Sequence, residues 1–198
     1  MNSEIEAKFI DIDHDTIRAK LVVLGATLEQ PMRMMKRVVV HTPAMTQKHA
    51  FLRIRDEGYR TTITYKQFDE DSIDGAKEYE VVVSDFETAV NIFKATGLVY
   101  DTYQESKREN WLIDGVEIML DEWPWLHPYL EIEAATETDV RRVAALLDLQ
   151  WEDAVFGDVT NIYKRQYSHI GEAGGDEIKL NWPIIRFEDE APELLRQA

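Results

Sequence analysis

The sequence contains no cysteine, and this absence excludes several kinds of chemistry. Disulfide bonds, thiolate metal ligands and a cysteine nucleophile are all ruled out. The sequence also lacks an apolar run near the roughly 20 residues that a membrane-spanning helix needs. Its first residues, MNSEIE, have neither the basic segment nor the apolar stretch of a signal peptide. We therefore expect a cytoplasmic protein.

Common catalytic motifs are missing as well. The glycines between positions 171 and 175 are not followed by the Lys-Ser/Thr pair of a phosphate-binding loop, and they are typical of a linker. No serine lies in a nucleophile-elbow motif. The five histidines show no metal-ligand spacing, so we expect them at scattered surface positions. Any active site must therefore be built from other residue types.

Positive charge is scarce in this chain. There are 22 Lys and Arg residues against 38 Asp and Glu residues, which gives a net charge of −16. Such a surface repels nucleic acid backbones and anionic membranes, so we expect neither as a partner. It would also repel a polyphosphate, unless the basic residues are concentrated at one place. The positions of the Lys and Arg residues are therefore more informative than their number.

A length of 198 residues suits one domain, or one domain with an appendage. The hydrophobic pattern alternates between two periodicities along the chain. Period-two segments predict antiparallel strands, with hairpin turns at Asp56–Tyr59 and Asp114–Gly115. Helical segments are expected over 13–24, from a Ser84 capping box to Gly97, over 136–147 and around 159–168. The order predicts an α+β fold, with an antiparallel sheet of about eight strands that can curl into a β-barrel. We place a first domain at 1–170, and a glycine-containing linker with an acidic tail at 171–198.

One face of these predicted strands is charged in a repeated way. Glu-x-Glu and Arg-x-Arg pairs recur at period two, opposite apolar residues on the other face. The members are Glu4, Glu6 and Lys8; Arg53 and Arg55; Lys66; Glu78 and Glu80; Arg108; and Glu131 and Glu133. One such pair alone would indicate a solvated strand face. If the sheet closes, however, all these faces converge on one interior, where like charges are costly unless neutralised.

The agents that would neutralise these charges are easy to name. Hard divalent cations bind carboxylate oxygens, and phosphate oxygens bind Arg and Lys. A metal–polyphosphate complex satisfies both requirements.

The ordered set of motifs resembles the CYTH family, also called triphosphate tunnel metalloenzymes. Glu4-Ile5-Glu6-Ala7-Lys8 is similar to the Glu-x-Glu-x-Lys signature that opens the family. The later charged strands and Asp121 follow in the family's order, Tyr163 resembles the tyrosine near its C-terminal end, and the likeness covers roughly 1–168. The resemblance implies an eight-stranded antiparallel tunnel, with helices packed outside, that binds a triphosphate and Mg²⁺ or Mn²⁺.

The same resemblance implies a role for each site residue. Phosphate-binding residues are Lys8, Arg53, Arg55, Lys66 and Arg108. Metal ligands are Glu4, Glu6, Glu131 and Glu133, with Asp121 as a further ligand or water contact. Glu78 and Glu80 bind a second metal or position water, which places them with Glu4, Glu6 and Lys8 among the expected catalytic residues.

Several alternatives stay open at this stage. The reaction is hydrolysis of inorganic triphosphate, thiamine triphosphate or a nucleotide, or else the class IV adenylyl cyclase reaction; a non-catalytic polyphosphate sensor is a third reading. Hydrolysis is favoured because no adenine-reading motif is evident. Many family members are dimers, so a homodimer is also open. Lys36 or Arg37 either adds a phosphate contact or lies on a solvated hairpin edge, and the aromatic loop 123–128 covers the core or walls the substrate entrance. The apolar segment 180–187 is expected to dock on the barrel or on a second subunit.

Overall fold

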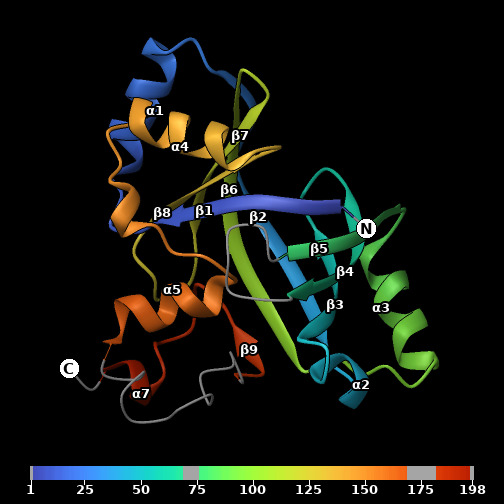
Figure 1. Cartoon of the computed structure of the whole chain (residues 1–198). Coiled ribbons are helices and arrows are strands. Elements are labelled where there is room, and N and C mark those ends of the chain that lie inside the picture. The colour runs from blue at the N-terminus through green and yellow to red at the C-terminus, as the bar shows by residue number, and fades with distance from the viewer. Residues whose placement is uncertain (1, 69–75, 169–181, 197–198) are drawn as a thin grey trace.

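The computed structural model describes residues 2–68, 76–168 and 182–196, without the side chains of residues 2–4 and 76. In these ranges, nine strands form one sheet (Figure 1). The strands are β1 (Asn2–Phe9), β2 (Thr27–Val40), β3 (Ala50–Asp56), β4 (Thr61–Phe68), β5 (Ala76–Val83), β6 (Thr102–Ile113), β7 (Val116–Glu122), β8 (Tyr129–Ala134) and β9 (Ile184–Ile185). The helices are α1 (His14–Val23), α2 (Pro43–Thr46), α3 (Phe86–Ala95), α4 (Glu137–Leu146), the 3₁₀ turn η1 (Trp151–Asp153), α5 (Val159–Gln166) and α7 (Glu193–Arg196).

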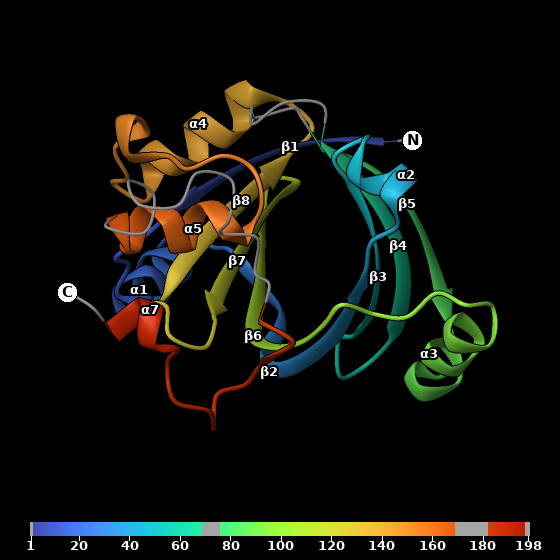
Figure 2. The same cartoon turned by 90° about the horizontal axis from the view of Figure 1, so that it is seen from below.

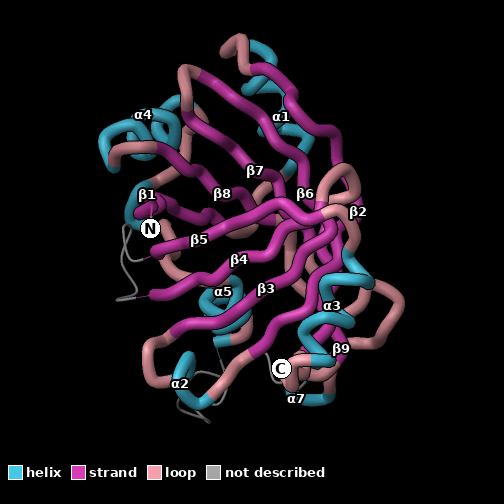
Figure 3. Tube along the Cα trace, turned by 90° about the vertical axis from the view of Figure 1, so that its right-hand side faces the viewer, coloured by secondary structure: helices cyan, strands magenta, loops and turns pink. Residues whose placement is uncertain are grey.

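The strand pairings run in a circuit. The order is β2-β3-β4-β5-β1-β8-β7-β6-β9, and β2 also pairs with β6. All the pairings among β1 to β8 are antiparallel, and the sheet is strongly curved (Figures 2 and 3). Among the pairings of β1 to β8, the contact between β1 and β5 is the shortest, running only from Asn2–Glu78 to Glu4–Ala76. The predicted α+β fold, with an eight-stranded antiparallel tunnel and helices outside it, is confirmed.

The hydrophobic core lies on the outer face of the sheet. Ala7 and Phe9 of β1 point outward and pack against Ile17 of α1 and Val140 of α4, all nearly without solvent exposure. Strand alternation then turns the intervening Lys8 inward. Burying these outer faces removes apolar surface from water, while the inner faces stay available for charged groups.

A second apolar cluster holds the other half of the sheet. Val38 of β2 and Ile54 of β3 pack against Phe86 and Val90 of α3 on the outside of the curve (Figure 2). Ile54 has no solvent exposure, and its neighbours in the sequence, Arg53 and Arg55, consequently face the interior. The two arginines are thus directed inward by the burial of the residue between them.

Local signals explain where the elements begin and turn. Asp114 and Gly115 both adopt positive φ angles, 50° and 78°, which is the conformation of a type I′ hairpin turn. The start of α3 differs from the expected Ser84 capping box. Its N-cap is Asp85, whose carboxylate accepts a hydrogen bond of 2.7 Å from the backbone N–H of Thr88. The helix begins one residue later because the Asp85 side chain reaches a free N–H of the first turn.

The described part of the tail docks on the sheet, as expected. β9 pairs in parallel with β6, and the Thr102 hydroxyl donates a 2.7 Å hydrogen bond to the Trp182 carbonyl. The Trp182 ring packs edge-on against Trp125 and Tyr163. Residues 188–190 are exposed, while the expected linker and residues 180–181 lie outside the described ranges. In the part of the chain that is described, no helix has the length and apolarity to cross a membrane.

Candidate active site

A large cavity occupies the interior of the curved sheet and extends to α5. Its volume is about 1410 Å³, and its wall carries most of the charged residues that the sequence pattern directs inward. Three of them, Glu6, Lys8 and Glu131, are no more than 6% exposed. Burial of this many charges requires that each be balanced by a neighbour or by a bound ion.

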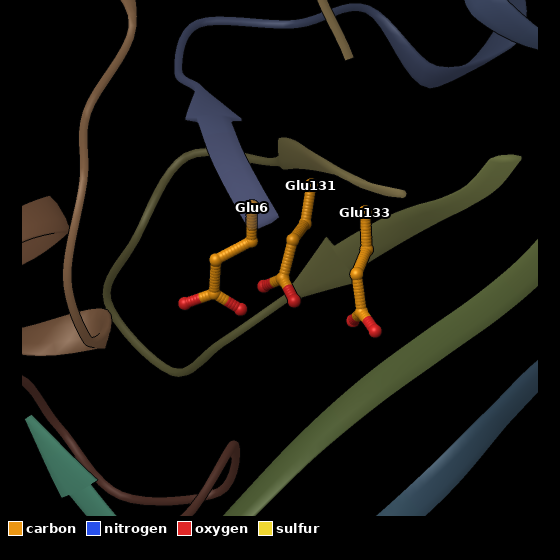
Figure 4. A group of neighbouring side chains, drawn as sticks. All are labelled: Glu6, Glu131 and Glu133. Carbon is orange, nitrogen blue, oxygen red and sulfur yellow. The ribbon is translucent and has the colours of Figure 1, made fainter. Parts of the chain in front are cut away.

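One side of the cavity is acidic. Glu6 of β1 and Glu131 and Glu133 of β8 point in the same direction from adjacent strands (Figure 4). One oxygen from each carboxylate lies within 4.8 Å of the others. The strand register brings them together, since Glu6 pairs with Glu133. Carboxylate oxygens at this spacing are suited to a hard divalent cation. Glu4 lies two residues before Glu6 in β1, and its side chain is not among those described.

Lys8 sits within this acidic group. Its Nζ lies 2.9 Å from a Glu6 oxygen and 3.5 Å from a Glu131 oxygen. Burial alone would lower the pKa of Lys8, but Glu131 and Glu6 outweigh it and raise the pKa above its ordinary value. Burial likewise opposes ionisation of Glu131, yet Lys8 and Arg108 hold the pKa of that carboxyl far below its usual range. Both groups are therefore charged at neutral pH.

Arg108 of β6 links the acidic side to Asp121 of β7. The guanidinium donates two hydrogen bonds of 2.7 Å to the two oxygens of Asp121, and a third, of 3.3 Å, to Glu131. Burial opposes the charge of Arg108, but Asp121 and Glu131 raise its pKa well above the ordinary value. Asp121 is fully buried and stands apart from the three clustered glutamates. Both Asp121 oxygens accept hydrogen bonds from Arg108 in this structure.

The opposite side of the cavity is cationic. Arg37 of β2 and Arg53 and Arg55 of β3 line the wall, with Arg37 and Arg55 paired across the two strands. Among the described residues, the buried Nε of each of these arginines has no hydrogen-bond partner. Burial, followed by the charges of Arg53 and Arg55, lowers the pKa of Arg37 well below its ordinary value. Burial and the charge of Arg53 lower the pKa of Arg55 to about 10. An anion with several oxygen acceptors would relieve this crowding.

Lys66, Glu78 and Glu80 connect the two sides. The Nζ atom of Lys66 in β4 lies 2.9 Å from a carboxylate oxygen of Glu78 in β5 and 3.9 Å from a carboxylate oxygen of Glu6. Glu80 accepts a 2.9 Å hydrogen bond from the Thr64 hydroxyl and keeps 31% of its side chain exposed to the cavity. Every residue in the sequence-based site set whose side chain is described therefore lines the cavity or, in the case of Asp121, pairs with a residue that does.

The structure shows which of Lys36 and Arg37 faces the cavity, a question that the sequence left open. Arg37 points inward, donates a 2.9 Å hydrogen bond to Ser106 and lies over the ring of Trp123 at 4.5 Å. Lys36 points outward, over the ring of Phe86. The two tryptophans of the aromatic loop 123–128 also point to different places. Trp123 lines the cavity, whereas Trp125 packs against Trp182 of the tail.

Sequence reasoning missed three charged residues around the first hairpin turn, Arg33, Glu57 and Arg60, which lie close to the predicted Arg55. Glu57 is 3% exposed and pairs with both Arg55 and Arg60. Its backbone carbonyl also accepts a 2.9 Å hydrogen bond from Arg33. The four residues line the cavity, and Glu57 was assigned only to a turn because strand alternation stops there. Lys164 of α5 also lines the wall, and no sequence pattern pointed to it.

Comparisons with known proteins agree with this arrangement. Residues 2–152 match the family model described as the CYTH domain. The solved PH1012 protein from Pyrococcus horikoshii OT3 is similar, with a TM-score of 0.65 and 26% identity, covering 76% of this chain and 93% of that one. No curated protein sequence matches the chain.

Two more distant structures share the fold. A candidate adenylate cyclase from Vibrio parahaemolyticus has a TM-score of 0.70 and 14% identity, covering 82% of this chain and 98% of that one. A candidate adenylyl cyclase from Hippeastrum, described as having a dominant triphosphatase activity, has a TM-score of 0.54 and 12% identity, covering 85% and 96%.

Proposed function

Because the chain belongs to the CYTH domain family, whose members are enzymes and depend on metal, we propose that it is a metal-dependent phosphohydrolase that cleaves a triphosphate inside the cavity. One observation carries this proposal. A row of three arginines with buried, unsatisfied Nε–H groups faces a cluster of three carboxylates across the same space. A triphosphate complexed with a divalent cation supplies acceptors for the first set and positive charge for the second.

The acidic side has the donor chemistry of an Mg²⁺ or Mn²⁺ site. We assign Glu6, Glu131 and Glu133 as the residues that hold the cation, with Glu4 as a further ligand from the same strand. Oxygen-only ligands at short mutual distances suit a hard cation and exclude a preference for soft metals. A cation bound here would neutralise the negative charge that develops on the phosphate oxygens during the reaction. Asp121 acts through Arg108 in this scheme, since both its oxygens are already engaged.

The basic residues bind and orient the phosphates. Arg53 and Arg55 clamp non-bridging oxygens from one wall, while Lys8, Lys66 and Arg108 approach from the acidic side. Phosphoryl transfer depends more on positioning and charge neutralisation than on covalent help from the protein.

Glu78 and Glu80 hold the attacking water. Its oxygen forms a bond to the terminal phosphorus, the bond from phosphorus to the bridging oxygen breaks, and diphosphate leaves. The proton of the water passes to a carboxylate and then to solvent. Both carboxylates have a cationic neighbour, since a Glu78 oxygen lies 2.9 Å from Lys66 Nζ and a Glu80 oxygen lies 4.0 Å from Arg60. The Glu80 side chain is the more exposed of the two, at 31% against 12%, and is therefore the one from which the proton returns more readily to solvent.

The test is a product analysis. The protein is incubated with Mg²⁺ or Mn²⁺ and with inorganic triphosphate, thiamine triphosphate or ATP, and the products are separated. Release of inorganic phosphate, lost in Glu131→Gln, supports the proposal. Formation of cyclic AMP and pyrophosphate from ATP would identify an adenylyl cyclase instead, and binding without turnover would identify a polyphosphate sensor.

A further inference from the structure

The β3–β4 hairpin carries two buried polar side chains that the proposed reaction does not use. Thr64 of β4 has no solvent exposure, and Glu57, in the turn that joins the two strands, is 3% exposed. Neither is among the residues assigned to bind phosphate, metal or water. A buried polar group is costly unless it is hydrogen-bonded, so the partners of these two side chains indicate their role.

Thr64 lies in the middle of a row across three adjacent strands. The register pairs it with Arg53 of β3 on one side and with Glu80 of β5 on the other. Its hydroxyl accepts a 3.3 Å hydrogen bond from Nη2 of Arg53 and donates one of 2.9 Å to a Glu80 oxygen. A hydroxyl has a single hydrogen to donate, so this pair of bonds fixes the arginine and the glutamate relative to each other.

Glu57 holds the next cation of β3 in a similar way. Its carboxylate forms an ion pair with Arg55 through one oxygen and with Arg60, at 2.7 Å, through the other. The backbone of the turn supports this placement, because the Glu57 N–H donates a 2.8 Å hydrogen bond to the Arg60 carbonyl. Arg33 donates a further hydrogen bond of 2.9 Å to the Glu57 carbonyl. Both carboxylate oxygens of Glu57 are therefore engaged in orienting arginines.

The two sets of contacts meet at Arg60. A terminal nitrogen of its guanidinium lies 4.0 Å from the second carboxylate oxygen of Glu80. The contacts thus form one chain with both ends on β3, which we call the hairpin network: Arg53, Thr64, Glu80, Arg60, Glu57 and Arg55. At each end the network engages a terminal nitrogen of the arginine, whereas the buried Nε has no partner among the described residues. The guanidinium groups are held in place and still have N–H donors for a ligand.

We propose that Thr64 and Glu57 are positioning residues. Together they hold the two phosphate-binding arginines of β3 at a fixed placement relative to the Glu80 carboxylate, which binds the attacking water. This inference rests on the proposed function, which assigns those roles. Attack on the terminal phosphorus requires alignment of the water with the phosphate, and a misplacement of about 1 Å lowers the rate by about 100-fold. The hairpin network supplies this alignment before the substrate binds.

The first experiment removes the Thr64 hydroxyl. Steady-state kcat and KM are measured with Mg²⁺ and with inorganic triphosphate, thiamine triphosphate or ATP, whichever the wild type turns over fastest. Thr64→Val should lower kcat by about 10- to 100-fold, with a smaller change in KM, because Glu80 loses its fixed placement. Thr64→Ser keeps the hydroxyl and should restore most of the activity. Thr62→Val is the control and should leave kcat unchanged, because Thr62 is equally buried on the same face of β4 and its hydroxyl has no partner among the described residues.

The second experiment neutralises Glu57. Glu57→Gln should raise KM by about 10-fold, because the charge-assisted hydrogen bond that holds Arg55 is weakened. Glu109→Gln is the matched control, since Glu109 is 6% exposed and accepts a 3.0 Å hydrogen bond from Arg18, but lies on the outer face of β6 beside Trp111 of the core. Both variants should melt earlier than the wild type, whereas KM should change only in Glu57→Gln.

The mobility of the arginine side chains tests the network without a substrate. NMR relaxation of the Nε–H groups in the ligand-free protein should show greater motion of Arg53 in Thr64→Val and of Arg55 in Glu57→Gln, and of neither in the two controls. Unchanged mobility, or equal kinetic losses in the controls, would overturn the inference and leave the hydrolase standing. If the wild type turns over no triphosphate, the hydrolase fails, and the NMR result alone decides whether the network holds the arginines.

Discussion

Arg37 and Arg53 are buried on neighbouring strands, and no described carboxylate forms an ion pair with either guanidinium. Folding places these charges together although burial and mutual repulsion oppose it, as the depressed pKa of Arg37 indicates. Binding of the phosphates that we propose as ligands would offset this cost, because their oxygens would accept hydrogen bonds from the two guanidinium groups.

The first prediction concerns Arg53. Its replacement in Arg53→Ala should cost about 2–5 kcal/mol of transition-state stabilisation, measured from kcat/KM, because a phosphate oxygen loses a buried charged donor. The thermal midpoint of the ligand-free protein should stay unchanged or rise, since repulsion is relieved. Lys107→Ala is the control, because Lys107 lies on the outer face of β6 against Phe187. A variant that melts earlier but keeps normal turnover would show that Arg53 is structural.

The second prediction concerns the pH dependence that Glu57 brings. Burial opposes its ionisation, but Arg55 and Arg60 prevail and lower its pKa from 4.5 to about 2. Since the folded pKa lies below the unfolded one, the stability from this group is fully present above about pH 4.5 and is lost as the pH falls towards 2. Urea unfolding across this window should show a flatter loss of stability in Glu57→Gln than in the wild type. Parallel curves for the two proteins would contradict the assignment.

At the scale of the elements, the sequence predicted most of what local pattern controls. The charged strand faces, the Asp114–Gly115 turn and the helix that Asp13 caps all follow from periodicity and capping chemistry. What the sequence left undecided depends on pairing between distant segments. Arg37 faces the cavity because β2 pairs with both β3 and β6, and the second pairing contains register shifts near Gln30. No local pattern encodes that register, because it is set by contacts far along the chain.

The third prediction concerns the docked tail. Trp182→Ala should lower the free energy of unfolding by about 2 kcal/mol, less than for a fully buried tryptophan, because its contacts with Trp125 and Tyr163 are lost. Truncation after Ile170 should destabilise further, while turnover per folded molecule stays unchanged. A truncated protein that stays folded but loses activity would place the tail in catalysis.

At the scale of the whole molecule, the net charge of −16 favours the binding of a cation. A net negative charge opposes the approach of the triphosphate that we propose as substrate. A divalent cation bound to that triphosphate would lower its negative charge, and the carboxylates of the acidic cluster would contact the cation rather than the phosphate oxygens.

The fourth prediction follows from that cluster. EDTA should abolish turnover, and Mg²⁺ or Mn²⁺ should restore it. Added metal should also raise the melting temperature, because a ligand at 100 times its Kd stabilises the folded state by about 2.7 kcal/mol. The metal-dependent rise should disappear in Glu131→Gln. Full activity after exhaustive chelation would contradict the metal site.

The placement of the core outside the sheet has a consequence for how this protein can change. Ile132 packs in the core and has no exposure, while its neighbours Glu131 and Glu133 face the cavity. Neighbouring positions in this strand are therefore under different constraints: Ile132 contributes to folding, and the glutamates on either side line the proposed active site. Ile132→Ala should lower the free energy of unfolding by about 2–5 kcal/mol. Substitution of Glu131 or Glu133 should instead lower turnover. The lining can then be altered towards a new substrate while the scaffold that carries it stays intact, which makes such a strand a natural starting point for evolving or engineering specificity.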